Sequence, residues 1–476
     1  MRPSFNVLDE PWIPVVALDG TRMLLGIRET LSRAPELKEI SAVSPLEEFS
    51  VYRFLSVFLM DALRPEDRDN IEELLDDGSF DMEQIEAYIS QCESEGVSFD
   101  LFDEKRPFMQ SISEGKLEAK PITNIDYFLP SGNNHLHFNH ERTETHSVTA
   151  AQATRLLLAL QQFCTSGLQG PSGVNGAPPY FGVVKGNTLF ETLVYTLVPT
   201  QTIDIPFDEH PVIWRSSEVL VPKKEIRETS WLRGMLFPAR IVKLMLPDEN
   251  MRVTQVYLGA GENYKHKDNW TDPFVSYRLV KTRTPLRPQR EKPVWRNFND
   301  FININGNQAS QLVSQHIRIS DSPYTQVTLY GVATDNAKYL DVMRHDLRFR
   351  SDIAENDEIV KLIKRCIESA EQIAKKLKSC LRKENVVPES VAHDAVNRFY
   401  GCCEEQFWKL CGECMLEETI QEQYRNWCRM IGQSAKDAYS NALVNVNLRG
   451  KEMRKAAVQQ KWLFTEIKKI KEDAEA

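Results

Sequence analysis

The last quarter of the chain constrains the fold most strongly, because its apolar residues repeat at helical spacing over four consecutive segments. One face of the first segment carries Ile359, Leu362, Cys366, Ile367, Ala370, Ile373, Ala374 and Leu377, as in a long amphipathic helix. Pro388 ends this segment, and further helical runs cover residues 389–415, 418–446 and 451–473, with a break at Gly450. Four long helices with short connections predict an antiparallel four-helix bundle over residues 351–476.

The preceding 350 residues mix helix and strand patterns. Residues 45–63 and 149–163 have apolar spacing typical of helices, and Thr149 can cap the second one. Near the N-terminus two apolar runs flank Asp19-Gly20, a dipeptide typical of strand–turn–strand hairpins. Residues 231–330 alternate between strands and loops without regular βαβ units. We therefore expect an α+β fold: a large mixed N-terminal domain at 1–350, followed by the four-helix bundle at 351–476.

The distribution of charge is more informative than the formal net charge of −10. Residues 47–104 hold 18 acidic and three basic residues. A second segment is basic: between residues 278 and 296 the cations are Arg278, Lys281, Arg283, Arg287, Arg290, Lys292 and Arg296, against Glu291 alone. Prolines separate these cations, so the segment is not an amphipathic helix. It is either a solvated face or an irregular backbone suited to tracking phosphates, and we favour the second.

Targeting signals and metal motifs are weak. The chain has no run of 18 apolar residues and no signal-peptide pattern at its N-terminus, so we expect a cytoplasmic protein without membrane contact. Cys411 and Cys414 form one CxxC within a helical pattern, without a partner CxxC at zinc-ribbon spacing. Buried helix thiols are favoured over a zinc site here.

A stretch rich in glycine and proline follows the helix predicted at 149–163. Residues 164–186 hold six glycines and three prolines, among them Gly167, Gly170, Gly173 and Gly176. Glycine permits positive φ and close backbone approach, whereas proline stiffens turns. The stretch contains neither GxGxxG nor GK[ST], so it is not a phosphate-binding loop of those kinds. It is either a set of turns or a backbone ridge that fits a narrow groove.

Just upstream, residues 130–149 form a polar stretch with four of the nine histidines. These are His135, His137, His140 and His146. Three interpretations stay open: a solvated loop, a metal site, or a loop that orders on nucleic acid, with Phe138 as wedge and Arg142 on phosphate. We find no GxSxG, Walker or defensible paired-carboxylate motif. His345-Asp346 we interpret as a structural hydrogen-bonding pair at a turn.

Seven segments, taken in chain order, together resemble one known family. They are FNVLDEPWIPV at 5–15, KRPFMQ at 105–110, FNH at 138–140, GLQGPSGVNGAPPYFG at 167–182, WLRGMLFPARIVKL at 231–244, RHD at 344–346 and NRFY at 397–400. They resemble the large subunit of the type I-E CRISPR Cascade complex, the CasA family. The resemblance covers essentially the whole chain, which makes it more specific than any single motif.

The resemblance implies a non-enzymatic subunit of a crRNA-guided complex. Such a subunit recognises the protospacer-adjacent motif in double-stranded DNA, helps to open the duplex and form the R-loop, and recruits a helicase-nuclease. The implied partners are the other Cascade subunits with crRNA, double-stranded target DNA and the recruited helicase-nuclease; no cofactor or metal is expected. The rival hypothesis is a metal-dependent nuclease that uses the histidine-bearing loop at 135–146.

The resemblance also implies DNA-binding residues. Phe138 and Asn139 match the family's aromatic loop, and Gly167, Gly170, Gly173 and Gly176 match its glycine loop as a segment. Arg278 and Lys281 lie where the family has a lysine that contacts the motif, and Arg283 belongs to the same basic run.

The implied duplex wedge falls at Asp335, Asn336, Ala337 and Lys338. The wedge glutamine of well-known members is absent from these positions. A cysteine-rich zinc site found in some members is absent too, because residues 241–277 contain no cysteine.

Overall fold

The computed structural model describes residues 2–113, 117–126, 146–167, 170–279, 281–335, 338–412, 420–444, 446 and 448–475. The chain forms two compact units. The first consists of Met1–Arg290, Ala309–Asp321 and Thr325–Arg348, and the second of Glu291–Gln308, Ser322–Tyr324 and Phe349–Ala476.

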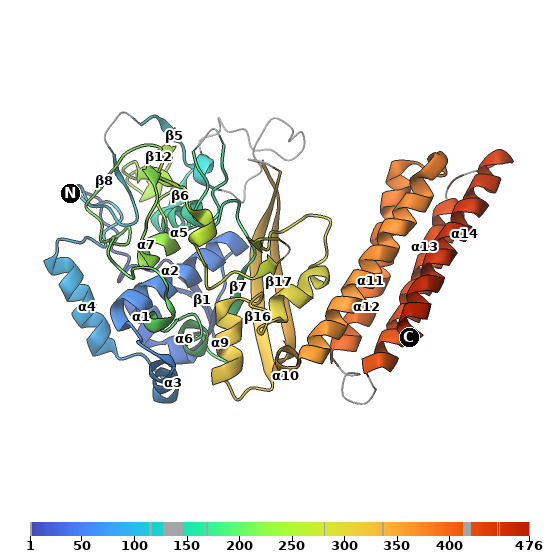
Figure 1. Ribbon diagram of the computed structural model, residues 1–476. Coiled ribbons are helices and arrows are strands. Elements are labelled where there is room, and N and C mark those ends of the chain that lie inside the picture. The colour runs from blue at the N-terminus through green and yellow to red at the C-terminus, as the bar shows by residue number, and fades with distance from the viewer. Residues whose placement is uncertain are drawn as a thin grey trace. The chain divides into compact units, whose positions relative to one another are not determined.

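The first unit is built around α2 (Pro45–Leu63), which is buried along nearly its whole length (Figure 1). Pro45 presets the first helical turn, and the Ser44 hydroxyl accepts a hydrogen bond from the Leu46 amide. Phe49, Phe54 and Phe58 are all fully buried, and each such side chain contributes about 1.5–3 kcal/mol of burial free energy. The helix predicted at 45–63 is thus confirmed, as the core of this unit.

The remaining helices of the first unit are short. They are α1 (Ile27–Ser32), α3 (Arg68–Asp77), α4 (Met82–Ser94), α5 (Ala150–Gln162), α6 (Leu189–Val194), α7 (Trp231–Met235) and α9 (Gln311–Ile319). The predicted cap is confirmed, since the Thr149 side chain accepts a hydrogen bond from the Gln152 amide at the start of α5. Most of the acidic residues of segment 47–104 lie on α3 and α4 or beside them.

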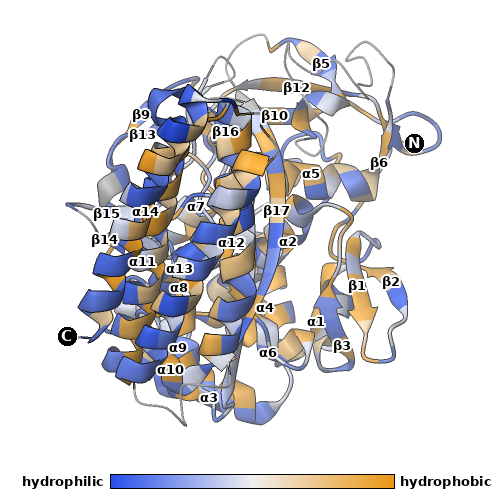
Figure 2. Cartoon of the chain, turned by 90° about the vertical axis from the view of Figure 1, so that its right-hand side faces the viewer, coloured by the Kyte–Doolittle hydropathy of each residue, from blue (hydrophilic) through white to orange (hydrophobic). Residues whose placement is uncertain are grey.

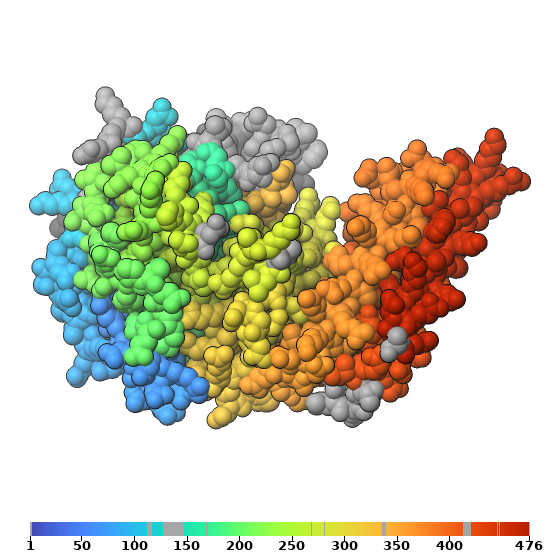
Figure 3. All heavy atoms as spheres, viewed as in Figure 1, coloured from blue at the N-terminus to red at the C-terminus, as the bar shows by residue number. Residues whose placement is uncertain are grey.

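Several small sheets surround these helices instead of one continuous sheet. The three-stranded sheets are β2 (Arg22–Leu25)–β1 (Ile13–Ala17)–β3 (Leu37–Ile40), β10 (Arg240–Leu244)–β12 (Gln255–Ala260)–β5 (Ala119–Pro121) and β17 (Lys338–Arg350)–β16 (Tyr324–Asp335)–β7 (Phe181–Val184). The two-stranded sheets pair β11 (Arg252–Val253) with β6 (Val148–Thr149), β13 (Asn263–Tyr264) with β9 (Glu225–Ile226), β14 (Tyr277–Leu279) with β15 (Arg283–Pro285), and β4 (Ile112–Ser113) with β8 (Val219–Leu220). The predicted hairpin at Asp19-Gly20 joins β1 and β2. Figure 3 shows the green and yellow middle of the chain spread over one face of this unit.

The second unit contains the predicted bundle. Its helices are α10 (Ser351–Glu355), α11 (Asp357–Arg382), α12 (Glu389–Gly412), α13 (Ile420–Val444) and α14 (Lys451–Glu475), preceded in the chain by α8 (Phe298–Ile302). The four long helices pack together with successive helices antiparallel, and Figure 2 shows their hydrophilic outer faces in blue. Burial raises the pKa of the Cys366 and Cys411 thiols in this bundle, while Cys414 lies outside the described residues. No described helix is both long and apolar enough to cross a membrane.

The second unit also takes in residues 291–308, which the sequence interpretation assigned to the N-terminal domain. The reason is aromatic packing. Trp295 lies with its ring centroid 5.0 Å from that of Phe407, and the Phe298 and Phe407 centroids are 5.8 Å apart. A segment that precedes the bundle by about 50 residues therefore supplies part of its core.

Candidate nucleic-acid interface

Residues 164–186, which we call the glycine segment, begin directly after α5 and form two tight turns. Gly167 and Gly170 exchange backbone hydrogen bonds of 3.0 and 3.1 Å, and the Gly176 amide donates to the Gly173 carbonyl at 3.1 Å. Gly170 has φ +134° and Gly176 has φ +75°, backbone conformations that residues with a Cβ rarely adopt. The glycines at these two positions are therefore required by the turns.

A buried arginine holds the first turn in place through hydrogen bonds to the flanking backbone carbonyls. Arg240, the first residue of β10, is 1% exposed, and its guanidinium donates to the carbonyls of Thr165, at 2.7 Å, and Pro171. A Cβ at Gly170 would lie 2.9 Å from the Ala260 Cα atom, so the turn packs directly on β12. Arg240 belongs to the segment WLRGMLFPARIVKL, which sequence reasoning used for the resemblance without assigning it this task.

Lys267 brings a cation to the second turn. Its Nζ atom donates to the Ser172 hydroxyl at 2.6 Å, and the side chain is half-buried. Burial lowers the pKa of Lys267, with nearby Lys265 and Arg287 acting in the same direction. Sequence reasoning missed this residue, because the contact joins positions 95 residues apart and no local motif marks it.

A buried ion pair supports the other side of the glycine segment. Asn175 donates through Nδ2 to the Asp272 carboxylate at 2.6 Å. The same carboxylate binds Arg53 of α2 at 2.6 Å, with both charged side chains almost completely buried. Asp272 therefore connects Asn175 of the glycine segment to Arg53 of α2. Removing either charge of the pair would leave the other buried without a partner charge, which is strongly destabilising.

The predicted basic residues lie on and around the hairpin of β14 and β15, residues 277–285, which we call the basic hairpin. Arg278 is half-buried opposite Thr284, whereas Lys281 and Arg283 are exposed. The Arg283 guanidinium stacks 3.7 Å from the Tyr277 ring centroid. Because stacking on Tyr277 holds the Arg283 guanidinium in one direction, this side chain loses less entropy when it binds a phosphate.

The basic hairpin continues directly against the glycine segment. The Tyr180 amide donates to the Leu286 carbonyl at 2.8 Å. Arg287 donates to the carbonyls of Ala177 and Asn175 at 3.3 and 3.4 Å, and its Nη2 atom lies 3.3 Å from where a Cβ of Gly176 would be. Arg287 is exposed. It was part of the basic run in the sequence but was not among the predicted DNA-binding residues.

The predicted wedge falls at the tip of a long hairpin formed by β16 and β17, which we call the long hairpin. β16 ends at Asp335 and β17 begins at Lys338, while Asn336 and Ala337 lie outside the described residues. Next to the tip, the Tyr339 hydroxyl donates to the Phe163 carbonyl at 2.8 Å. This contact places the base of the tip beside the start of the glycine segment.

The first unit thus brings together three of the predicted elements: the glycine turns, the basic hairpin and the long hairpin. The predicted Phe138 and Asn139 lie outside the described residues, as do His135, His137 and His140. Among the residues that are described, no three His, Cys, Asp or Glu side chains form a group suited to holding a metal ion.

His345-Asp346 does not lie at a turn, and this interpretation was wrong. Both residues belong to β17, where neighbouring side chains point to opposite faces of the sheet. Asp346 accepts hydrogen bonds from Thr328 at 2.7 Å and Arg344 at 2.8 Å. The His345 ring instead lies 6.4 Å from the Tyr180 ring, so the two residues do not form a catalytic dyad.

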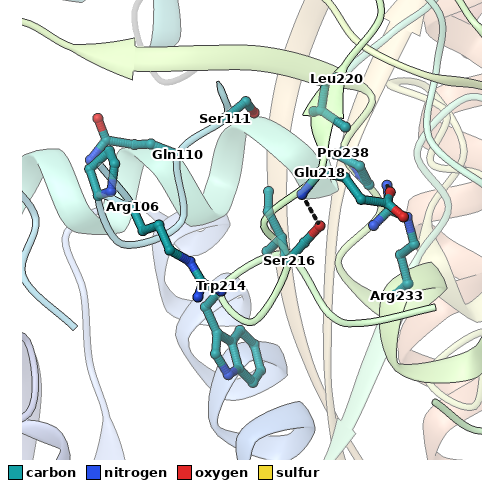
Figure 4. Close-up of a pocket in the computed structure, with 11 residues that line it drawn as sticks. Arg106, Gln110, Ser111, Trp214, Ser216, Glu218, Leu220, Arg233 and Pro238 are labelled. Carbon is teal, nitrogen blue, oxygen red and sulfur yellow. Dashed lines mark hydrogen bonds and ion pairs between the residues drawn. The ribbon is translucent and has the colours of Figure 1, made fainter. Parts of the chain in front are cut away.

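The pocket drawn in Figure 4 has a structural role. Its cavity of about 20 Å³ is comparable to the space that one water molecule needs. Gln110 on its wall donates to the Leu101 carbonyl and accepts from the Leu244 amide, both at 2.7 Å, and Arg106 donates to the Arg215 carbonyl at 2.7 Å. The segment RPFMQ is therefore used to join loops and β10, and this cavity is too small for an organic substrate.

Known proteins resemble this chain over nearly its whole length. A sequence model of the family described as CRISPR-associated protein Cse1 matches residues 6–438. The CRISPR-associated protein CasA/Cse1 of Thermus thermophilus is 30% identical over 365 residues, covering 72% of this chain and 70% of the relative.

Solved structures share the fold. Thermus thermophilus CasA (Cse1) superposes with a TM-score of 0.77 at 24% identity, covering 98% of this chain and 100% of that one. Thermobifida fusca Cse1 gives a TM-score of 0.77 at 19% identity, with 98% of each chain covered. A chain of a CRISPR RNA-guided surveillance complex gives 0.80 at 18% identity, covering 97% of this chain and all of that one. The predicted α+β class with a C-terminal helical bundle is confirmed.

Proposed function

Because the chain belongs to the CRISPR-associated Cse1 family, we propose that it is the DNA-recognising, non-enzymatic subunit of a crRNA-guided type I-E Cascade complex in the cytoplasm. It recognises the protospacer-adjacent motif in double-stranded DNA, helps to open the duplex and form the R-loop, and recruits a helicase-nuclease. Its partners are the other Cascade subunits with their crRNA, the target DNA and that helicase-nuclease.

The observation that carries the proposal is the glycine segment with its flanking cations. The minor groove is narrow and shows a degenerate pattern of donors and acceptors. A ridge of glycine backbone can enter it where side chains would clash, and Lys267 and Arg287 stand beside the ridge to reach acceptors or phosphates. A glycine ridge in the minor groove accepts several short motifs, while guide–target pairing supplies the remaining specificity.

The long hairpin supports the opening step. Tyr339, next to the tip, is hydrogen-bonded to Phe163 at the start of the glycine segment, so an element inserted at the first base step would meet the duplex next to the motif. Unstacking a base step costs about a few kcal/mol, which phosphate contacts from the basic hairpin can offset. Neither Asp335 nor Lys338 is a glutamine, so opening here depends on residues other than the wedge glutamine of well-known members.

Two glycine substitutions test motif recognition. Gly173→Ala places a methyl group at ordinary contact distance, 3.8 Å from the Gln161 carbonyl, so the turn keeps its shape while the ridge becomes wider. We expect this variant, reconstituted into Cascade, to lose motif-dependent binding across a library of randomised motifs. Gly401→Ala is the matched control, because its added methyl group meets open space on α12.

Unchanged motif selection by Gly173→Ala would contradict minor-groove recognition by the ridge. The rival nuclease hypothesis is tested on the purified chain, by metal analysis and by incubation with DNA and divalent cations. Metal-dependent cleavage that disappears in His137→Ala would replace the present proposal with that of a nuclease.

A further inference from the structure

A buried carboxylate of α2 binds both strands of the long hairpin. Glu48 is 5% exposed, and its Oε1 atom accepts a hydrogen bond from the Tyr330 hydroxyl of β16 at 2.5 Å. The same oxygen accepts from Nε of Arg344 on β17 at 3.3 Å. One oxygen atom of the core helix thus binds a side chain from each strand of the long hairpin.

Further polar contacts hold this cluster in place. Arg344 also binds Asp346 at 2.8 Å, and Asp346 in turn accepts from Thr328 of β16 at 2.7 Å. Lys185, which follows β7, donates to the Tyr52 hydroxyl of α2 at 2.5 Å. Side chains of β16 and β17 are therefore bonded to each other and to α2, and Lys185 beside β7 is bonded to α2 as well.

The bonds to Glu48 lie well away from the tip of the long hairpin. Tyr330 precedes Asp335 by five residues, and Arg344 follows Lys338 by six. At a strand rise of about 3.3 Å per residue, the tip lies about 17–20 Å from the bonds to Glu48. Tyr339 next to the tip is bonded to Phe163, so the direction of the hairpin is set by that contact together with the bonds to Glu48, which lie at this distance from the tip.

We propose that Glu48 is a positioning residue for duplex opening: by binding Tyr330 and Arg344 it fixes the direction of the hairpin tip relative to the glycine segment. The inference rests on the proposed function and deepens it. Glu48 does not touch DNA in this proposal. It acts through the hairpin, and its loss leaves motif recognition intact while making the insertion of the tip less effective.

The surroundings of the cluster allow the proposal to be tested without emptying the core. Arg344 is 35% exposed and lines a cavity of about 570 Å³, together with Lys38, Lys185, Asp346 and Arg348. Arg344→Gln therefore removes one bond to Glu48 at the edge of the protein. Tyr330→Phe removes the other bond without any change of charge or of side-chain shape beyond one hydroxyl.

The experiment uses complete Cascade reconstituted with each variant. Opening is followed by the fluorescence of 2-aminopurine placed in the first base pairs beside the motif, and affinity is measured for a duplex target and for a target already opened as a bubble. We expect Arg344→Gln, Tyr330→Phe and Glu48→Leu each to slow opening about tenfold, since each removes a donor or the acceptor of these bonds. Binding to the bubble target and selection among motifs should remain as in the wild type.

Lys38→Gln is the matched control, because it removes a cation from the same cavity without touching Glu48. If Lys38→Gln slows opening as much as Arg344→Gln while Tyr330→Phe has no effect, the cavity acts through its charge and the proposal is wrong. Equal weakening of binding to the duplex and bubble targets, with a lower melting temperature, would also overturn it, because that pattern indicates general loss of structure.

A variant of the tip separates this inference from the proposed function. If Asp335→Ala combined with Lys338→Ala slows opening whereas the variants of Glu48, Tyr330 and Arg344 do not, the hairpin opens DNA and the positioning role is wrong. If the tip variant has no effect on opening, the wedge assigned under the proposed function is wrong as well.

Discussion

His316 shows at the scale of one residue how burial sets a chemical property. It lies in α9 with 3% of its surface exposed, and neither ring nitrogen has a hydrogen-bond partner among the described residues. Its ring packs edge-on against Tyr195, with centroids 4.5 Å apart. Burial lowers the pKa of His316 from 6.5 to about 4, because the imidazolium would lose its hydration there.

This pKa predicts that stability falls as the pH drops below about 6.5. In that range the unfolded chain binds a proton at His316, whereas the folded chain takes it up only near pH 4, so protonation favours unfolding. Between pH 7 and pH 5 we expect the wild type to lose about 2 kcal/mol more stability than His316→Leu, measured by urea denaturation. Parallel pH profiles for the wild type and His316→Leu would refute this.

Some single residues could be predicted from the sequence and others could not. The turns at Gly170 and Gly176 were predictable, because glycine itself is the local signal for positive φ. Lys267 and Glu48 were not, because their contacts reach residues 95 and 282 positions away. A charged residue that is buried by distant segments looks the same in sequence as one that is solvated.

At the scale of elements, long periodic helices were predicted well and polar strands poorly. The bundle helices α11 to α14 follow the predicted segments, since apolar spacing over some 25 residues averages out local exceptions. β17 was missed around Arg344 to Asp346, because a strand at the edge of a sheet, with charged residues along one face, lacks an apolar signal. The glycine segment was located correctly, but its support by Arg240 depends on packing between elements.

The aromatic cluster around Trp295 gives a prediction for the second unit. Trp295 is fully buried, and its ring lies 6.2 Å from that of Trp427 and 6.1 Å from that of Tyr400. We expect Trp295→Ala to destabilise this unit by about 3–5 kcal/mol, because the cavity left between α12 and α13 cannot close completely. Hydrogen exchange should accelerate in both helices. Trp462→Ala is the control, since Trp462 is 52% exposed on α14. Unchanged protection in α12 would show that residues 291–308 are not part of this core.

At the scale of the whole molecule, the net charge of −10 and the proposed DNA contacts are compatible because the charges are segregated along the chain. The acidic residues of 47–104 gather around α3 and α4, whereas the basic hairpin adjoins the glycine segment. Association with a polyanion depends on the charges near the contact, because salt screens charges more than about 8–10 Å away. An acidic protein can therefore hold a local phosphate-binding surface.

The same reasoning predicts how target binding depends on salt. The slope of log K against log salt concentration is negative, and each phosphate neutralised by a cation makes it steeper by about 0.9 for duplex DNA. Lys281 and Arg283 are exposed on the basic hairpin, and Arg283 is held in place by Tyr277. We expect Lys281→Gln to weaken binding of duplex targets by Cascade equally for all motifs, and to make the slope less steep by about one unit. Adding Arg283→Gln should flatten it by about another unit. Lys243→Gln, an exposed lysine of β10, is the matched control and should leave the slope unchanged. If the double variant keeps the wild-type slope, the basic hairpin does not contact phosphates, and its cations serve solubility or a protein partner.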